Sequence, residues 1–195
     1  LFADRNVDRF IFGWEMPASM TQFFNPFFII LFGSIFSVMW VKLSKIGKNP
    51  SIPLKFCFGI VQLALGFLLT QVGFQFVNEA YQVPLLTLVF LYMLHTTGEL
   101  FLSPIGLSMV TKLSPKSMAG TAMGAWFLSF AIANYVGGKI AALTGGHGGG
   151  EVSSAEDGLL QYLDTFATIG YVLLAIAALI FVLNKPIQKL MHGVE

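Results

Sequence analysis

Glu99 is an acidic side chain in the middle of a long apolar stretch. Residues 80–111 contain no other Asp, Glu, Lys or Arg. A charged group at the centre of a bilayer costs about 2.5–3.5 kcal/mol on insertion scales, so such residues normally face a cavity or a partner. No Lys or Arg of this chain is expected at similar depth, so the partner of Glu99 is a missing helix, a ligand, a proton or water. We interpret Glu99 as a binding or proton-carrying group; a structural ion pair is the alternative.

Other polar residues share the helix face of Glu99, because they recur at intervals of three or four: Tyr92, His95, Ser103 and Gly106. Pro104 removes a backbone donor near this point and can bend the helix. Bent or broken spans often frame the substrate sites of transporters. His95 alone is better interpreted as a core histidine with a satisfied ring.

Two further groups carry polar or aromatic side chains. Gln22 and Asn25 lie one turn apart before Pro26, and each amide can both donate and accept hydrogen bonds, either to a ligand or between helices. Trp126 and Ser129 lie three residues apart, and Trp126 lies too deep in its predicted helix for the interfacial belt. Trp126 could therefore line a cavity or fill a packing gap.

The elements that position these residues follow from the distribution of charge. The chain has 195 residues, of which 55% are apolar and 11% charged, against about 25% charged in soluble domains. Five charge-poor stretches are each long enough for one membrane helix of about 20 residues. Continuous apolar runs, without the alternation of a β-barrel, favour an all-α integral membrane protein. The predicted spans are 20–43, 54–77, 84–110, 118–142 and 163–184.

Basic residues predict the orientation of these spans. Eight of the eleven Lys and Arg residues lie in alternate loops or after the last span, which should therefore be cytoplasmic. The C-terminus is then cytoplasmic, and residues 1–19 form an extracellular or periplasmic loop before the bundle of residues 20–195. An outside start without a signal indicates that an upstream helix is missing, so we expect a C-terminal part of a longer protein. The glycine run 145–150 is expected to be a flexible linker.

Several functions are disfavoured by what the chain lacks. A net charge of +1 provides no bulk basic surface for nucleic acid, and the single Cys57 allows neither an intrachain disulfide nor a cysteine metal cluster. Hydrolase and zinc-protease motifs are missing, so an enzyme is not expected, and no cofactor is indicated. Gly59, Gly66 and Gly73, at heptad spacing, predict a seam where two helices approach closely.

The sequence resembles the proton-dependent oligopeptide transporter family of the major facilitator superfamily. GELFLSPIGLSMV at 98–110 is similar to the family's tenth helix, and QFFNPFFII at 22–30 to its eighth. MAG at 118–120 with GAWFLS at 124–129 resembles the eleventh helix, and FADRNVDR at 2–9 the loop after the seventh. The resemblance implies helices 8–12 of a fold with two six-helix halves, the N-terminal half being a missing partner.

The resemblance also implies a function, namely uptake of di- and tripeptides driven by a proton gradient across the cell membrane, here the bacterial inner membrane. Glu99 matches the residue that receives the peptide ammonium, and Asn25 matches a contact to the same end. Trp126 and Ser129 match pocket positions, and Ser103 and Gln22 complete the candidate substrate-binding set. Phe127 and Leu128 are assigned to a cytoplasmic gate. The alternatives are a related carrier of nitrate or a drug, and a channel or non-transporting membrane subunit.

Overall fold

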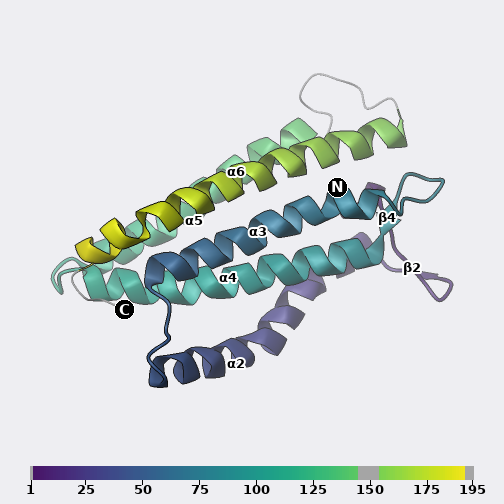
Figure 1. Ribbon diagram of the computed structural model, residues 1–195. Helices are drawn as coiled ribbons and strands as arrows, with labels where there is room; N and C mark the ends of the chain where they lie inside the picture. The colour runs from purple at the N-terminus through teal and green to yellow at the C-terminus, as the bar shows by residue number, and fades with distance from the viewer. Residues whose placement is uncertain (1, 145–153, 192–195) are drawn as a thin grey trace.

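The computed structural model describes residues 2–144 and 154–191. Within these ranges five long helices run side by side (Figure 1). They are α2 (Phe24–Lys45), α3 (Ile52–Phe74), α4 (Leu85–Leu113), α5 (Ala119–Thr144) and α6 (Ala155–Leu190), and a 3₁₀ helix, η1 (Ala18–Phe23), leads into α2.

Length and composition show that this is a multi-pass membrane bundle. The helical segments 18–45, 52–74, 85–113 and 155–190 are each long and apolar enough to cross a membrane. Helix α5 has 26 residues, which at 1.5 Å per residue gives about 39 Å, more than the thickness of a bilayer core. The predicted all-α membrane fold is confirmed. Where the bilayer begins and ends along each helix stays a prediction.

Helix α3 forms the centre of the described bundle. It packs along its length against α4 on one side and α6 on the other, while α2 packs on α4 (Figure 1). The predicted glycine seam on α3 is confirmed: a Cβ on Gly66 would lie 2.7 Å from Nε2 of His95, and a Cβ on Gly73 would lie 3.0 Å from Cβ of Thr87. Glycine is required at these points because α4 leaves no room for a side chain.

Helix α6 is longer than the predicted span 163–184, since it runs from Ala155 to Leu190. Its N-terminus is capped by Ser154, whose Oγ accepts a hydrogen bond of 3.1 Å from the backbone N–H of Asp157. Acidic residues in the first turn also suit the positive end of the helix dipole. Charged residues therefore limit the apolar span but do not end the helix. The glycine run 145–150 and the end of the chain after residue 191 lie outside the described residues.

The segment expected to be a loop, residues 1–19, contains short regular elements. A helical turn, α1 (Phe2–Arg5), is followed by β1 (Val7–Asp8), which pairs in parallel with β4 (Val83–Pro84) at the start of α4. Strands β2 (Phe10–Ile11) and β3 (Trp14–Glu15) form an antiparallel hairpin. Whether this segment is extracellular stays a prediction.

A buried side chain fastens this segment to the bundle. Asn6, which is 1% exposed, donates hydrogen bonds of 3.4 Å to the backbone carbonyls of Tyr81 and Ala155. It thereby joins the N-terminal segment to the α3–α4 connection and to the first turn of α6. An apolar cluster forms the core at this end: Phe2, Val7, Val83, Leu88, Leu159, Tyr162 and Leu163.

Candidate functional site

Glu99 lies on the side of α4 that is turned away from α3. Its neighbour Gly98 is buried against α3, whereas the Glu99 side chain is exposed. Among residues 2–144 and 154–191 no basic group lies within ion-pair distance of its carboxylate. This chain therefore leaves a carboxylate on the surface of an apolar helix, available to a cation from outside the described residues.

Asn25 is positioned by α4, one turn before Glu99. Its Nδ2 donates a hydrogen bond of 3.2 Å to Oγ1 of Thr96, which is fully buried. Residues three apart on a helix share a face, so this bond brings the amide of α2 to the turn that precedes the carboxylate. The oxygen of the Asn25 amide remains an acceptor, which suits an ammonium group.

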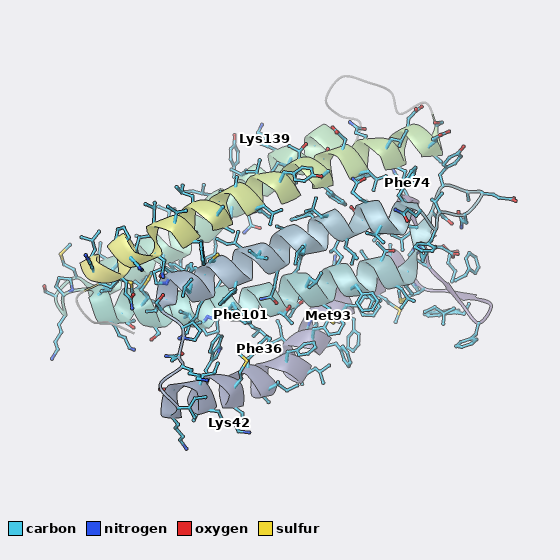
Figure 2. The ribbon with its side chains drawn as sticks, viewed as in Figure 1. Phe36, Lys42, Phe74, Met93, Phe101 and Lys139 are labelled. Atoms are coloured by element: carbon cyan, nitrogen blue, oxygen red, sulfur yellow. The ribbon has the colours of Figure 1, made fainter. Side chains whose placement is uncertain are left out.

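Farther along α2, aromatic rings attach the helix to α4. Phe36 of α2 and Phe101 of α4 lie close together (Figure 2), with their ring centroids 5.2 Å apart and nearly edge-on. Trp40 contacts the same Phe101 ring, at 5.0 Å between centroids. Such edge-to-face pairs stabilise by about 0.5–1.5 kcal/mol beyond their buried area. Helix α2 is thus held to α4 both before and after the level of Glu99.

Gln22 lies apart from Asn25, in a different environment. It lines a cavity of about 500 Å³ that Tyr92 and His95 of α4 also line. Nε2 of His95 lies 3.2 Å from the carbonyl oxygen of Leu63, and its ring lies 4.5 Å from that of Phe67. A carbonyl only accepts, so Nε2 carries the hydrogen of this bond. His95 is therefore a core histidine with a satisfied nitrogen, as its sequence context predicted.

Two turns after Glu99 along α4, Trp126 of α5 rests on a glycine. A Cβ on Gly106 would lie 2.6 Å from Cζ2 of the Trp126 indole. Gly106 shares a face with Glu99 and Ser103, because they are spaced by three or four residues. Ser103 is half-buried on this face. The structure thus packs both α2 and α5 on α4, and α5 does so at Gly106, on the stripe that carries the acid.

The remaining predicted residues lie on the outer surface of α5. Ser129 donates a hydrogen bond of 2.6 Å to the backbone carbonyl of Trp126, so its oxygen remains an acceptor. Phe127 and Leu128 are 58% and 60% exposed. Sequence reasoning did not assign Thr96 as the partner of Asn25, nor Gly106 as the surface on which Trp126 rests. Both roles follow only from these contacts. Gly106 had the helical spacing as a signal, whereas Thr96 had none.

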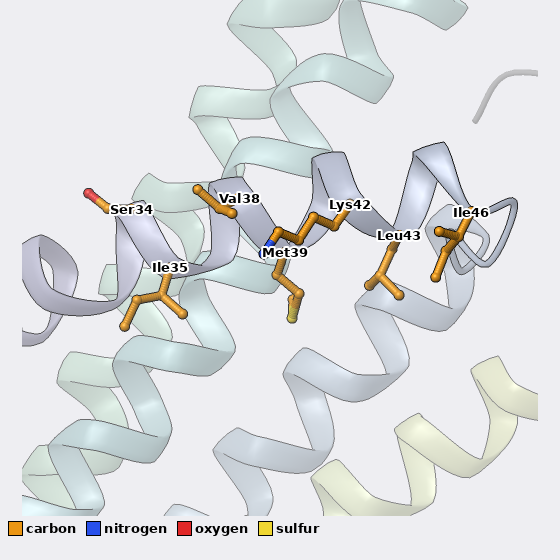
Figure 3. A pocket seen from close by; sticks show the side chains of 7 residues that line it. All are labelled: Ser34, Ile35, Val38, Met39, Lys42, Leu43 and Ile46. Atoms are coloured by element: carbon orange, nitrogen blue, oxygen red, sulfur yellow. The ribbon is translucent and has the colours of Figure 1, made fainter.

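A second cavity lies on α2, and its lining is mostly apolar. A groove of about 640 Å³ follows one face of α2, and its lining contains one cation, Lys42, and no carboxylate (Figure 3). Its lining residues all come from α2 and the residue after it: Ser34, Ile35, Val38, Met39, Lys42, Leu43 and Ile46. Within the described residues, no group of three His, Cys, Asp or Glu side chains could hold a metal ion.

Comparison with known proteins identifies the family. Residues 1–149 match the POT family over most of the chain. The chain belongs to the POT family. This confirms the resemblance seen in the helix motifs and makes the chain part of a transporter rather than of an enzyme. The POT family assignment also agrees with the major facilitator arrangement of the helices.

Curated members of the POT family align with nearly the whole chain. It is 35% identical to dipeptide and tripeptide permease A of Edwardsiella piscicida, over 98% of this chain and 38% of the permease. It is 36% identical to the peptide transporter YePEPT of Yersinia enterocolitica, over 100% of this chain and 37% of that protein. The chain therefore spans less than two-fifths of the length of these relatives.

Solved POT structures have the same fold over this region. A peptide transporter POT in complex with sulfate superposes with a TM-score of 0.82 at 31% identity, covering 98% of this chain and 36% of the transporter. A POT family transporter in complex with a thioalcohol-conjugated peptide superposes with a TM-score of 0.77 at 28% identity, covering 95% and 36%. The helices described here thus correspond to one part of a larger POT transporter.

Proposed function

We propose that the full-length protein is a proton-coupled symporter of di- and tripeptides that works by alternating access, and that this chain is its C-terminal part. Relatives that share about a third of its residues are named as dipeptide and tripeptide permeases. A structural neighbour was solved with a conjugated peptide. These names support a peptide as substrate, and the exposed carboxylate of Glu99 near the Asn25 amide supports a site for one end of that peptide.

The observation that carries this proposal is the exposed carboxylate of Glu99, which has no basic partner in the described residues. In a membrane protein, such a group requires a cation, a proton or water. The N-terminal ammonium of a peptide is a suitable cation, and the Asn25 amide oxygen one turn away supplies a second acceptor. Trp126, Ser129 and Ser103 then contact the rest of the substrate, whereas Gln22 lines the separate cavity beside His95.

The carboxylate end of the peptide needs a cation that the membrane part of this chain lacks. That cation belongs to the N-terminal half of the full-length protein. Glu99 pairs alternately with a basic residue of that half and with the peptide ammonium. Exchange between these two partners biases the rocking of the two halves, since a ligand shifts a conformational equilibrium by its differential affinity.

The proposed orientation places the C-terminus in the cytoplasm of a bacterial cell and residues 1–19 on the outer side of its inner membrane. The distribution of Lys and Arg between alternate loops supports it. Phe127 and Leu128 are large apolar side chains on the open surface of α5. They would meet the N-terminal half when the cytoplasmic side closes.

Uptake by the full-length protein tests the proposal. Purified protein is reconstituted into liposomes, and accumulation of labelled dialanine is measured with an imposed proton gradient, inside alkaline. Wild type should accumulate the peptide, and Glu99→Gln should lose proton-driven accumulation. Glu79→Gln is the matched control, because Glu79 is an exposed acid in the α3–α4 connection and should leave uptake unchanged.

Three outcomes would contradict the proposal. Wild-type accumulation by Glu99→Gln would remove the assigned role of this residue. Uptake that nitrate or a drug blocks, but that unlabelled dipeptide does not, would indicate another substrate. Flux without saturation or counterflow would indicate a channel.

A further inference from the structure

Helices α4 and α5 approach closely where the Trp126 indole lies over Gly106. A Cβ on Gly106 would lie 2.6 Å from Cζ2 of the indole on α5 and 3.2 Å from Cζ of Phe56 on α3. Real Cβ atoms do not approach carbon so closely, so any side chain larger than hydrogen must displace a neighbour. The indole occupies the space that the missing Cβ leaves.

The indole can be displaced in one direction. Behind Gly106 the Phe56 ring of the central helix α3 closes the space, whereas Trp126 is only half-buried. Among the described residues its ring has one aromatic contact, with Phe130 of its own helix, at 6.3 Å between centroids. A Cβ at position 106 would therefore push the indole away from α4, toward the exposed face that carries Glu99.

The distance between Glu99 and this contact matches the length of a short peptide. Gly106 follows Glu99 by two helical turns on the same face, an axial distance of about 10 Å. A fully extended tripeptide spans about 10 Å and a dipeptide about 7 Å. If the ammonium binds Glu99, the third residue of a tripeptide reaches the level of the Trp126 indole, and the second residue of a dipeptide reaches it through a long side chain such as that of Phe.

We propose that Gly106 is a positioning residue for peptide selectivity: it holds the Trp126 indole against α4 and so keeps room for a bulky second or third side chain. The inference rests on the proposed peptide transport and on the assignment of the ammonium to Glu99. Gly106 touches no substrate itself. Gly106 acts by fixing the position of the indole. Replacing Gly106 should therefore change the KM for some peptides rather than the maximal rate of transport.

The experiment uses the full-length transporter in liposomes and compares KM and maximal rate for dialanine and diphenylalanine. Gly106→Ala should raise the KM for diphenylalanine by about tenfold, the lower end of the effect of one methylene in a fitted pocket. The KM for dialanine and both maximal rates should stay nearly unchanged. Gly138→Ala is the control, because a Cβ on Gly138 meets nothing within 4 Å among the described residues.

A double-substitution cycle then shows whether Gly106 acts through Trp126. In a Trp126→Ala background the indole is gone, so adding Gly106→Ala should have no further effect on the diphenylalanine KM. The inference would be overturned if Gly106→Ala raised the KM equally for both peptides. It would also be overturned if Gly106→Ala raised the diphenylalanine KM by the same factor with and without Trp126. If Gly106→Ala fails to accumulate in the membrane, the double variant should accumulate again, and its failure to do so would also overturn it.

These measurements distinguish a failure of the proposed peptide transport from a failure of the role proposed for Gly106. If wild type and Gly138→Ala transport neither dipeptide, the proposed function is wrong. If both transport dipeptides but Gly106→Ala shows no selectivity change that depends on Trp126, only the role of Gly106 is wrong.

Discussion

Gly59 of α3 and Gly98 of α4 meet backbone to backbone. A Cβ on Gly98 would lie 2.7 Å from the carbonyl oxygen of Gly59, and a Cβ on Gly59 would lie 2.8 Å from that of Gly98. Successive residues of an α-helix are rotated by about 100°, so the residue after Gly98 turns away from α3. This contact therefore determines which side of α4 carries the Glu99 carboxylate.

Gly98→Ala should force α3 and α4 apart. Overpacking of this kind typically costs about 1–3 kcal/mol, so the full-length protein should unfold at a lower temperature in detergent. Gly33→Ala on α2 is the control, because a Cβ there meets nothing within 4 Å of the described residues, and alanine is a better helix former than glycine. An unchanged melting temperature for Gly98→Ala would contradict the close contact.

Asn25 and Thr96 should show measurable coupling. Side-chain hydrogen bonds between membrane helices contribute about 0.6 kcal/mol on average and at most about 1.7 kcal/mol. A double-mutant cycle with Asn25→Ala and Thr96→Val, followed by denaturant unfolding, should give a coupling energy in this range. Asn134→Ala is a matched amide control, since its Nδ2 donates a hydrogen bond within its own helix, to the carbonyl of Phe130. Strict additivity of the two substitutions would show that the bond contributes nothing.

Asn6 should determine how firmly the N-terminal segment is attached. Asn6→Ala removes two hydrogen bonds to backbone carbonyls, each contributing about 0.5–1.5 kcal/mol in general. Asn6→Asp should be worse, because a carboxylate cannot donate and would face two carbonyl oxygens. Limited proteolysis of the connection around Tyr81 should become faster in the order wild type, alanine, aspartate. Equal rates for wild type and Asn6→Asp would contradict this attachment.

Tyr81, in the connection between α3 and α4, should make the fold sensitive to alkaline pH. A hydrogen bond to Glu156, together with the negative charge of Glu156, raises the pKa of the Tyr81 hydroxyl above its ordinary value. The protonated form is thus favoured in the folded state. Its contribution is present below the unfolded pKa of about 10 and is lost as the pH rises through the folded pKa.

The measurement compares melting temperatures of wild type and Tyr81→Phe between about pH 8 and pH 11. Wild type should be the more stable at the lower pH, and the difference should shrink as the pH rises. Glu156→Gln should weaken the same dependence. A difference that stays constant across this range would show that Tyr81 does not titrate against Glu156.

Sequence reasoning predicted the helices and the position of the unusual acid, for a direct physical reason. Apolar stretches of about 20 residues must form helices in lipid, because unpaired backbone groups cost several kcal/mol there. Helix α6 extends beyond the predicted span 163–184 at both ends, because Ser154 caps it before the apolar stretch begins and charged residues do not end a helix. Strand β1 carried no comparable signal, because its two-residue pairing depends on the distant β4, and the β2–β3 hairpin is too short to give one.

What the sequence by itself determined is therefore a membrane bundle, its family and the isolated acid Glu99, since these depend on composition and local spacing. Only the tertiary structure decided that Asn25 bonds to Thr96 and that Trp126 rests on Gly106. The first contact depends on how α2 approaches α4, and the second on how α5 approaches α4. The tertiary structure also separated Gln22 from Asn25, although the two are one turn apart in sequence, because the chain passes from η1 into α2 between them. The close approach of α4 to α3 and to α5 is possible because Gly59, Gly98 and Gly106 have no side chain.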